Sequence, residues 1–249
     1  MKDLEHIALL IDADNTQLSK LEGVIQEISK HGRIVVKRAY ANWSKQQLKN
    51  WESELKRLAI KAEQQFDYVT GKNTTDIALV IDAMKLLHTG LYDCFAIVSS
   101  DSDYTPLAIH LHESGVYVMG VGAKMTPEPF INSCDEFVLL ENVGTAQPKE
   151  KPESSEQQNG KKNASPAKPK KKDPLYEIHT LLKSAWDSYQ DDDGFAFNSM
   201  AGNSIKRVKP DFDVRSFGYR RLSSLIEAFP QYYEVKSTRD GNTKKYRCK

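Results

Sequence analysis

Short apolar runs alternate with amphipathic stretches along the N-terminal part of the chain. The runs have the length of buried strands, which predicts strands at residues 7–11, 34–40, 66–69, 95–98, 116–121 and 137–140. Apolar residues at helical spacing between the runs predict helices at 18–29, 45–64, 75–87 and 105–113. Alternating strands and helices form βαβ units. We therefore expect an α/β fold with a doubly wound parallel sheet covered by helices on both faces.

The C-terminal part follows a different pattern. An amphipathic helix presents an apolar face made of Leu175, Ile178, Leu181, Leu182, Ala185, Trp186 and Tyr189. Helical stretches follow at 199–208 and 214–229, and two β-rich runs then flank Asp240–Gly241, a dipeptide typical of hairpin turns. Three helices and a terminal hairpin predict a small winged helix-turn-helix (α+β) domain.

Residues 147–173 separate these two parts. They contain prolines, a lysine run and no aliphatic side chain larger than alanine, so they have little apolar surface to bury. We expect a disordered linker here, joining a domain at 1–146 to a smaller one at 174–249.

Composition excludes several classes of protein. The 35 lysines and arginines nearly balance the 34 aspartates and glutamates, giving a net charge of +1, so an argument for nucleic acid must come from local clusters. The three cysteines form no CxxC pattern, which argues against structural zinc or a disulfide framework. The first apolar run is too short for a signal peptide, and no run is long enough to span a membrane. We expect a cytoplasmic protein with no membrane partner.

Acidic residues gather where predicted strands end. Asp12 and Asp14 follow the first strand, Asp101 and Asp103 follow the strand at 95–98, and Asp76 opens a helix. In a doubly wound sheet these two strands lie side by side at the switch point, where ligands bind at the carboxyl ends. Asp12 and Asp101 should therefore face each other, with Asp76 pointing to the same edge.

Clustered carboxylates repel one another unless a cation compensates them. Several hard oxygen ligands suit Mg²⁺ or Mn²⁺, and such ions assist in-line displacement at a phosphoryl group. The alternative for each aspartate is a helix cap or turn former, and Asp82 is better explained as a solvated or salt-bridged side chain.

The motifs in this part resemble the NYN domain, the PIN-like nuclease fold of the LabA-like group, over most of residues 5–142. The resemblance rests on an apolar run leading into DxxN (Ala8 to Asn15), the Lys72–xxx–Asp76 segment, SSDSDY, YVMGVGAK and a late FVLLE strand. It implies a metal-dependent ribonuclease or, as in some members, a degenerate version that only binds nucleic acid. The complete acidic set favours activity, and for attack by a metal-activated water we expect products with a 5′-phosphate and a 3′-hydroxyl. Asp12, Asp76 and Asp101 would be metal ligands, and Asp103 would be a fourth ligand or orient the water. Asn15 would lie near the scissile phosphate.

Residues 174–248 resemble a LOTUS domain, also called OST-HTH. The resemblance rests on the opening helix with Trp186, the segment FDVRSFGYRRLSSLIEAFP and the final hairpin. LOTUS domains are RNA-associated modules, which implies RNA as a partner, G-rich RNA included, or a DEAD-box helicase.

Basic and aromatic residues cluster in both domains, as phosphate and base contacts require. The alternative is a solubilising surface and, for Trp43, a packing role. The candidate nucleic-acid-binding residues are Lys37, Arg38, Trp43, Lys72, Lys124, Lys206, Arg207, Arg215, Tyr219, Arg220, Arg221, Lys244 and Lys245.

Two other hypotheses compete with the nuclease. DADNT satisfies the DxDxT pattern of haloacid-dehalogenase-type phosphatases, with Asp12 as nucleophile and Asp14 as acid/base. SSDSD, however, lacks the glycine and the spacing that this family needs later in the chain. The second hypothesis is a non-catalytic RNA-binding adaptor that recruits a helicase or nuclease. The sequence leaves the oligomeric state and the number of metal ions open.

Overall fold

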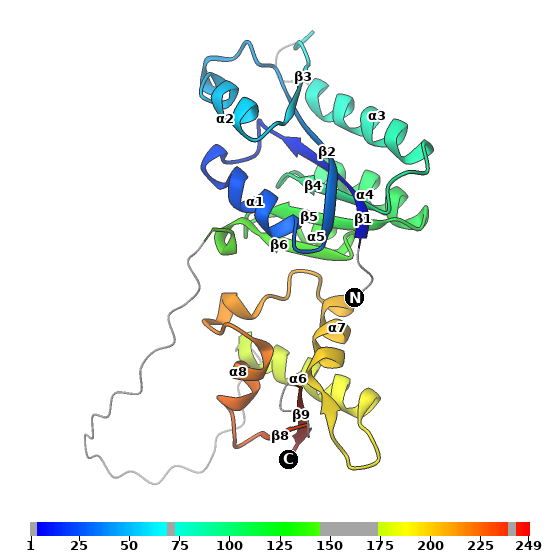
Figure 1. Ribbon diagram of the computed structural model, residues 1–249, viewed down its shortest axis with the longest axis vertical. Coiled ribbons are helices and arrows are strands. Elements are labelled where there is room, and N and C mark those ends of the chain that lie inside the picture. The colour runs from blue at the N-terminus through cyan, green and yellow to red at the C-terminus, as the bar shows by residue number, and fades with distance from the viewer. Residues whose placement is uncertain (1–3, 69–72, 145–173, 239–242) are drawn as a thin grey trace, which may run out of the picture. The chain divides into compact units, whose positions relative to one another are not determined.

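The computed structural model describes residues 4–68, 73–144, 174–238 and 243–249 (Figure 1). The chain divides into two compact units, one N-terminal and one C-terminal. The linker predicted at 147–173 lies outside the described residues. Within the described ranges, no helix has both the length and the apolar character needed to cross a membrane.

A six-stranded sheet forms the centre of the N-terminal unit, in the order β3-β2-β1-β4-β5-β6. Every neighbouring pair runs parallel. The α/β fold and its parallel sheet are therefore confirmed, and β4 lies beside β1 as expected for the switch point. The strands are β1 (Leu4–Asp12), β2 (Gly32–Ala41), β3 (Lys61–Gln64), β4 (Cys94–Val98), β5 (Tyr117–Gly122) and β6 (Glu136–Leu139).

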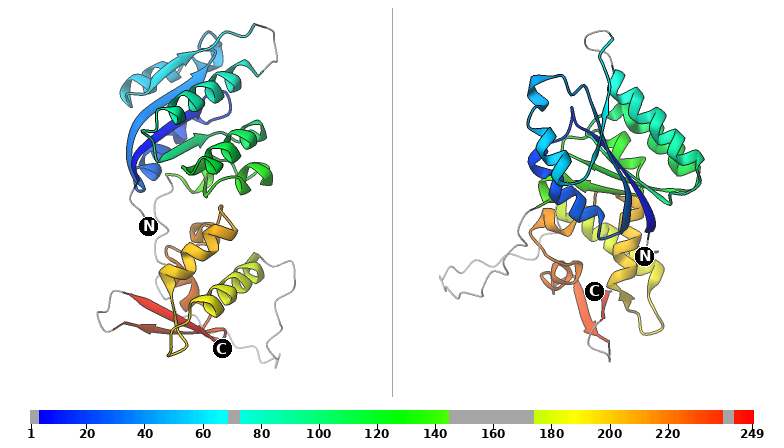
Figure 2. Two further views of the ribbon diagram at one scale, coloured as in Figure 1. Left: turned by 90° about the vertical axis from the view of Figure 1, so that its right-hand side faces the viewer. Right: turned by 45° about the horizontal axis from the view of Figure 1, so that its top comes forward.

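Helices cover both faces of this sheet (Figures 1 and 2). Successive side chains of β1 face opposite sides of the sheet. Ile7, Leu9 and Ile11 therefore belong to one core cluster, and Ala8 and Leu10 belong to the other. The first cluster includes residues of α1 (Leu21–Ile28) and α2 (Trp51–Arg57), and the second includes α3 (Thr74–His88), α4 (Thr105–Glu113) and α5 (Glu128–Asn132). Burial on both faces explains why β1 reads as a continuous apolar run.

The prediction for residues 45–69 was wrong in two respects. The helix ends at Arg57 in α2, well before Gln64, and the third strand is Lys61–Gln64 and not 66–69. Phe66 and Tyr68 are exposed, whereas β3 is a short edge strand that contains no aliphatic residue larger than alanine. An edge strand with little buried surface has no apolar run by which a sequence pattern can find it.

The C-terminal unit consists of helices packed on a small antiparallel sheet. The sheet has the order β7-β9-β8, and its two longer strands form the predicted terminal hairpin. The tip of this hairpin, with Asp240–Gly241, lies outside the described residues. The elements are α6 (Pro174–Tyr189), β7 (Ala196–Phe197), α7 (Asn198–Val208), the 3₁₀ turn η5 (Val214–Phe217), α8 (Leu222–Glu227), β8 (Tyr233–Ser237) and β9 (Lys244–Cys248).

The third helix predicted here, at 214–229, is interrupted. Gly218 adopts a left-handed conformation with φ of 80° and ends η5, and α8 begins only at Leu222. Side-chain hydrogen bonds join α6 to the rest of the unit. Tyr246 Oη donates to the Leu182 carbonyl at 2.7 Å, and Trp186 Nε1 donates to the Gly194 carbonyl at 2.9 Å.

Candidate functional site

The carboxyl ends of β1 and β4 carry the predicted acidic residues. Asp12 is the last residue of β1 and is fully buried, and Ser99–Asp101 continue directly from β4. Because both strands run in the same direction, these residues lie at one edge of the sheet.

Three carboxylates converge beside this edge. Asp76, Asp101 and Asp103 each offer one oxygen atom, and these oxygens lie within 4.8 Å of one another. Asp76 is in the first turn of α3, and Asp101 caps the 3₁₀ turn η3 (Ser102–Tyr104) by accepting a hydrogen bond from the Asp103 amide at 2.9 Å. Asp101 is therefore a cap, as the alternative explanation held, and also a member of the carboxylate trio.

Ser99 connects Asp12 to this trio. Its buried hydroxyl donates to Asp12 Oδ2 at 2.8 Å and accepts from the Asp101 amide at 3.0 Å. Sequence reasoning did not single out Ser99, although it lies within the SSDSDY motif. Asp12 and Asp101 are thus joined through a hydroxyl, and Asp12 is not a member of the trio among the described residues.

Neutral side chains donate hydrogen bonds to Asp12, Asp76 and Asp103. Asn15 donates through Nδ2 to Asp12 Oδ2 at 2.8 Å, so in this structure it orients Asp12. Tyr104 Oη donates to Asp76 Oδ1 at 2.8 Å, and the Asn73 amide donates to Asp103.

Burial and mutual repulsion affect the acidity of this cluster. Burial is the main cause that raises the pKa of Asp12, against hydrogen bonds from Asn15 and Ser99 that lower it. Burial also raises the pKa of Asp76, and the nearby charges of Asp101 and Asp103 raise it further. The ionised cluster is therefore destabilised without a cation.

The donor set fits a hard divalent ion. Three carboxylate oxygens, one from α3 and two from the turn at η3, gather at one point. Each residue keeps some exposure through which water completes a coordination shell. The histidines His88, His110 and His112 lie on α3 and α4 and are not part of the cluster. An all-oxygen set is typical of Mg²⁺ or Mn²⁺ sites and not of zinc sites.

Comparison with known families agrees with this geometry. A sequence model of the NYN domain matches residues 6–141, which is more than half of the chain. The chain belongs to the NYN domain family. The model of the OST-HTH/LOTUS domain matches residues 170–244, so the C-terminal unit of this NYN protein is a LOTUS domain. NYN domains are nucleases and LOTUS domains bind RNA, as the sequence motifs implied.

Two solved structures are similar to this NYN protein at low identity. A protein of unknown function, VPA0982 from Vibrio parahaemolyticus RIMD 2210633, is 18% identical, with a TM-score of 0.48, and the match covers 57% of this chain and 96% of that one. An uncharacterized protein from gene locus NE0665 of Nitrosomonas europaea is 24% identical, with a TM-score of 0.27, over 38% of this chain and 92% of that one. No curated protein matches the chain.

Several predicted RNA-binding residues of the NYN domain already have structural partners. Arg38 forms an ion pair with Asp82 on α3, as expected for Asp82, and the Lys37 ammonium donates to the Leu58 carbonyl. The Trp43 indole donates to the Glu63 carbonyl at 3.0 Å. Lys124 is exposed near the start of the loop after β5. Lys72 lies outside the described residues.

Asp14 forms an ion pair that does not fit a role as the acid/base partner of Asp12. Its carboxylate pairs with Lys45 at 3.3 Å, and Lys45 also pairs with Asp67 at 3.5 Å. Together with the family match, this ion pair favours the nuclease hypothesis over the phosphatase hypothesis.

In the LOTUS domain the basic candidates fall into two groups. Arg215 pairs with Asp213, Lys244 with Glu227, and Lys245 with Asp191. The remaining candidates are mostly solvent-facing: Arg207, Arg220 and Arg221 are exposed, and Lys206 and Tyr219 are half-buried.

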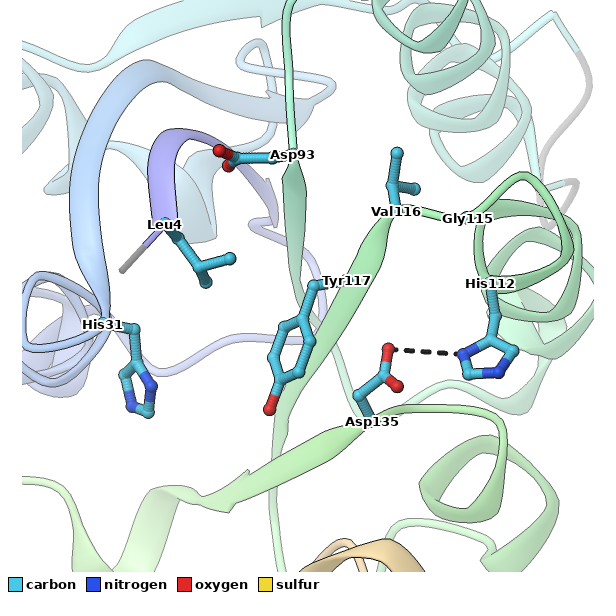
Figure 3. A pocket seen from close by; sticks show the side chains of 8 residues that line it. All are labelled: Leu4, His31, Asp93, His112, Gly115, Val116, Tyr117 and Asp135. Atoms are coloured by element: carbon cyan, nitrogen blue, oxygen red, sulfur yellow. Dashed lines mark hydrogen bonds and ion pairs between the residues drawn. The ribbon is translucent and has the colours of Figure 1, made fainter. Parts of the chain in front are cut away.

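A separate pocket lies at the opposite, amino-terminal edge of the NYN sheet (Figure 3). Its carboxylates serve the backbone: Asp93 accepts from the amides of Glu5 and His6 at 2.9 and 3.1 Å, and Asp135 accepts from the Val118 amide at 2.8 Å. These groups hold strand starts together and do not form a ligand set like the trio.

Proposed function

We propose that this NYN–LOTUS protein is a ribonuclease that uses Mg²⁺ or Mn²⁺ to hydrolyse RNA phosphodiesters. The observation that carries the proposal is the convergence of Asp76, Asp101 and Asp103 within 4.8 Å at the carboxyl edge of the sheet. Membership of a nuclease family supports it, and so does the presence of an RNA-binding domain in the same chain.

Asp76, Asp101 and Asp103 would hold the ion directly, and we propose Asp12, which Ser99 joins to Asp101, as a further ligand. A divalent ion bound there lowers the pKa of water and stabilises charge on the phosphoryl group. Ser99 and Asn15 keep the Asp12 carboxylate aimed at the edge of the sheet, because both donate to its Oδ2 atom. Tyr104 does the same for Asp76. Fixed carboxylates of this kind avoid reorganisation during the reaction.

The LOTUS domain would select the RNA, through a winged-helix surface in which the exposed Arg207, Arg220 and Arg221 contact phosphates. G-rich RNA and a DEAD-box helicase are the partners proposed for it. We also propose the division into 1–146, a linker at 147–173 and 174–249, and a cytoplasmic location.

The decisive experiment incubates purified protein with end-labelled single-stranded RNA in Mn²⁺ or Mg²⁺, with EDTA and Asp101→Asn samples alongside. We expect cleavage that both controls abolish, with products carrying a 5′-phosphate and a 3′-hydroxyl. Asp14→Asn is the matched control variant, because Asp14 pairs with Lys45 and not with the trio. It should retain most of the cleavage.

Two outcomes would contradict the proposal. RNA retained in a gel shift without cleavage above the Asp101→Asn level would favour the adaptor hypothesis. Turnover of p-nitrophenyl phosphate that Asp14→Asn abolishes would favour the phosphatase hypothesis.

A further inference from the structure

A second pocket of the NYN domain lies at the same edge of the sheet as the predicted acidic residues. It has a volume of about 460 Å³ and is bounded by the segment that follows β2, by α2 and by β3. The residues that line it are Trp43, Ser44, Lys45, Gln46, Leu48, Lys49, Glu52, Leu55 and Ala62.

Its position follows from the sheet register. Tyr40 pairs with Asp12 across β2 and β1, so Trp43 and its neighbours leave the sheet at the same edge as the acidic residues. Lys45 lines the pocket and also reaches Asp14, which is two residues beyond Asp12, at 3.3 Å. The pocket is therefore adjacent to the place where the scissile phosphate is expected.

Trp43 is held as a rigid wall of this pocket. Its indole Nε1 donates to the Glu63 carbonyl at 3.0 Å, and its backbone amide donates to Gln64 Oε1 at 3.1 Å. The indole also packs at a tilt of 54° against buried Trp51, with ring centroids 6.0 Å apart. A fixed aromatic ring beside the apolar Leu48, Leu55 and Ala62 gives a flat planar ligand both a stacking surface and apolar contact.

Lys49 is the lining residue that an anionic ligand can approach from solvent. Lys45 pairs with both Asp14 and Asp67, which compensate its charge, and Lys49 is exposed at the pocket rim. The carboxylate among the lining residues, Glu52, pairs with Lys56 at 2.6 Å. A planar ring with an attached phosphate matches this combination of an aromatic wall and basic rim.

We propose that this pocket takes one unstacked RNA base beside the cleaved bond, with the base stacked on Trp43 and its phosphate near Lys49. The inference rests on the proposed ribonuclease function and adds a subsite that requires single-stranded RNA. The volume lies within the range of pockets for single small ligands, and a paired base cannot leave its duplex to enter it without unstacking.

Photo-crosslinking tests this without any need for catalysis. The full chain is mixed in EDTA with a single-stranded RNA of mixed sequence in which the uridines carry iodine at C5, a group that crosslinks to stacked aromatic rings. We expect an adduct on the peptide containing Trp43. Adducts confined to other peptides would overturn the proposal. Trp43→Phe should keep the adduct, and Trp43→Leu should lose it while adducts in the LOTUS domain persist.

Binding measurements give a second test that does not depend on the folding of a Trp43 variant. Lys49→Ala should weaken RNA binding and reduce the slope of log affinity against log salt by about 0.7, as expected when one single-strand phosphate is no longer neutralised. The matched control is Lys30→Ala, an exposed lysine at the other end of the domain. Equal salt slopes for both variants would overturn the assignment of Lys49.

The two proposals fail in distinguishable ways. Cleavage of RNA by a protein that forms no Trp43 adduct would remove the base pocket and leave the ribonuclease intact. A Trp43 adduct on a protein that never cleaves RNA would remove the ribonuclease proposal and leave the base pocket intact.

Discussion

At the scale of single residues, the site depends on side chains that donate to carboxylates as much as on the carboxylates themselves. Asp12 is buried, and a buried charged carboxylate is tolerated only with hydrogen-bond donors around it. Ser99 and Asn15 supply two such donors, and Ser99 also accepts from the Asp101 backbone. One hydroxyl therefore determines the relative position of residues that are far apart in the sequence.

Removing that hydroxyl should affect both stability and metal binding. We expect Ser99→Ala to lower the free energy of unfolding by about 1–3 kcal/mol, because a buried carboxylate loses a donor. Its Mn²⁺ affinity should fall about 10- to 100-fold, as for other groups that orient metal ligands. Denaturant unfolding and calorimetric titration measure the two effects. Ser102→Ala, at an exposed position in the same motif, should change neither.

The burial of Asp76 and the like charges around it predict a pH-dependent effect on the metal-free protein. Its pKa is raised above 3.8, so its contribution to stability is present below about pH 3.8 and is lost as pH rises through the raised value. In EDTA at pH 7, Asp76→Asn should therefore be more stable than the wild type, by at most about 1 kcal/mol because solvent screens a half-exposed group. The difference should shrink towards pH 4.

Unfolding curves in EDTA between pH 4 and 7 test this, and Mn²⁺ provides the control. Bound metal stabilises the native state of the wild type, so saturating Mn²⁺ should reverse the order of the two proteins. A wild type that is more stable than Asp76→Asn throughout in EDTA would contradict the repulsion argument.

At the scale of elements, the site depends on how closely β4 and β5 approach each other. A Cβ atom on Gly122, at the end of β5, would lie 2.7 Å from the Ser99 carbonyl and 2.6 Å from Thr126 Oγ1. Glycine at this position lets the loop after β4 sit against β5, and this loop carries Ser99 and Asp101.

Gly122→Ala should therefore destabilise the NYN domain by about 1–3 kcal/mol, the usual cost of overpacking, and should reduce cleavage by moving Ser99. Gly202, within α7, is the matched control: a Cβ there meets Leu222 at 3.6 Å, an ordinary contact. Gly202→Ala should stabilise the LOTUS domain by about 0.5–1 kcal/mol through helix propensity. Scanning calorimetry measures the stability of both variants, and an RNA cleavage assay tests the loss of activity expected for Gly122→Ala.

At the scale of the whole molecule, chemistry and RNA selection are assigned to different units. The acidic trio lies in the NYN domain, whereas the exposed arginines Arg207, Arg220 and Arg221 lie in the LOTUS domain. If this assignment is correct, variants in the two units should change different kinetic constants.

Replacing both Arg220 and Arg221 by alanine in the full chain should raise KM for RNA while leaving kcat nearly unchanged. The salt slope should fall by about 0.7 for each phosphate that an arginine no longer neutralises. Asp101→Asn should instead abolish kcat and preserve RNA binding. Steady-state kinetics at several salt concentrations check both, and a fall in kcat for the arginine variant would contradict the separation of roles.

The sequence by itself determined the fold class and the identity of the acidic residues. Apolar runs buried on both faces predict parallel strands, and the carboxyl ends of such strands share an edge, so Asp12 and Asp101 could be assigned to one edge from their places in the chain. The motifs also identified the NYN and LOTUS domains, which the family matches confirm.

The tertiary structure alone decided which of these groups meet. It selected Asp76, Asp101 and Asp103 as the converging trio, linked Asp12 to Asp101 through Ser99, paired Lys45 with Asp14 and put β3 at Lys61–Gln64. The physical reason is that the spacing of apolar residues along the sequence shows which side chains of one helix or strand face a core. Contacts between side chains depend instead on how separate elements pack, and a solvent-facing edge strand or a bridging hydroxyl leaves no periodic trace.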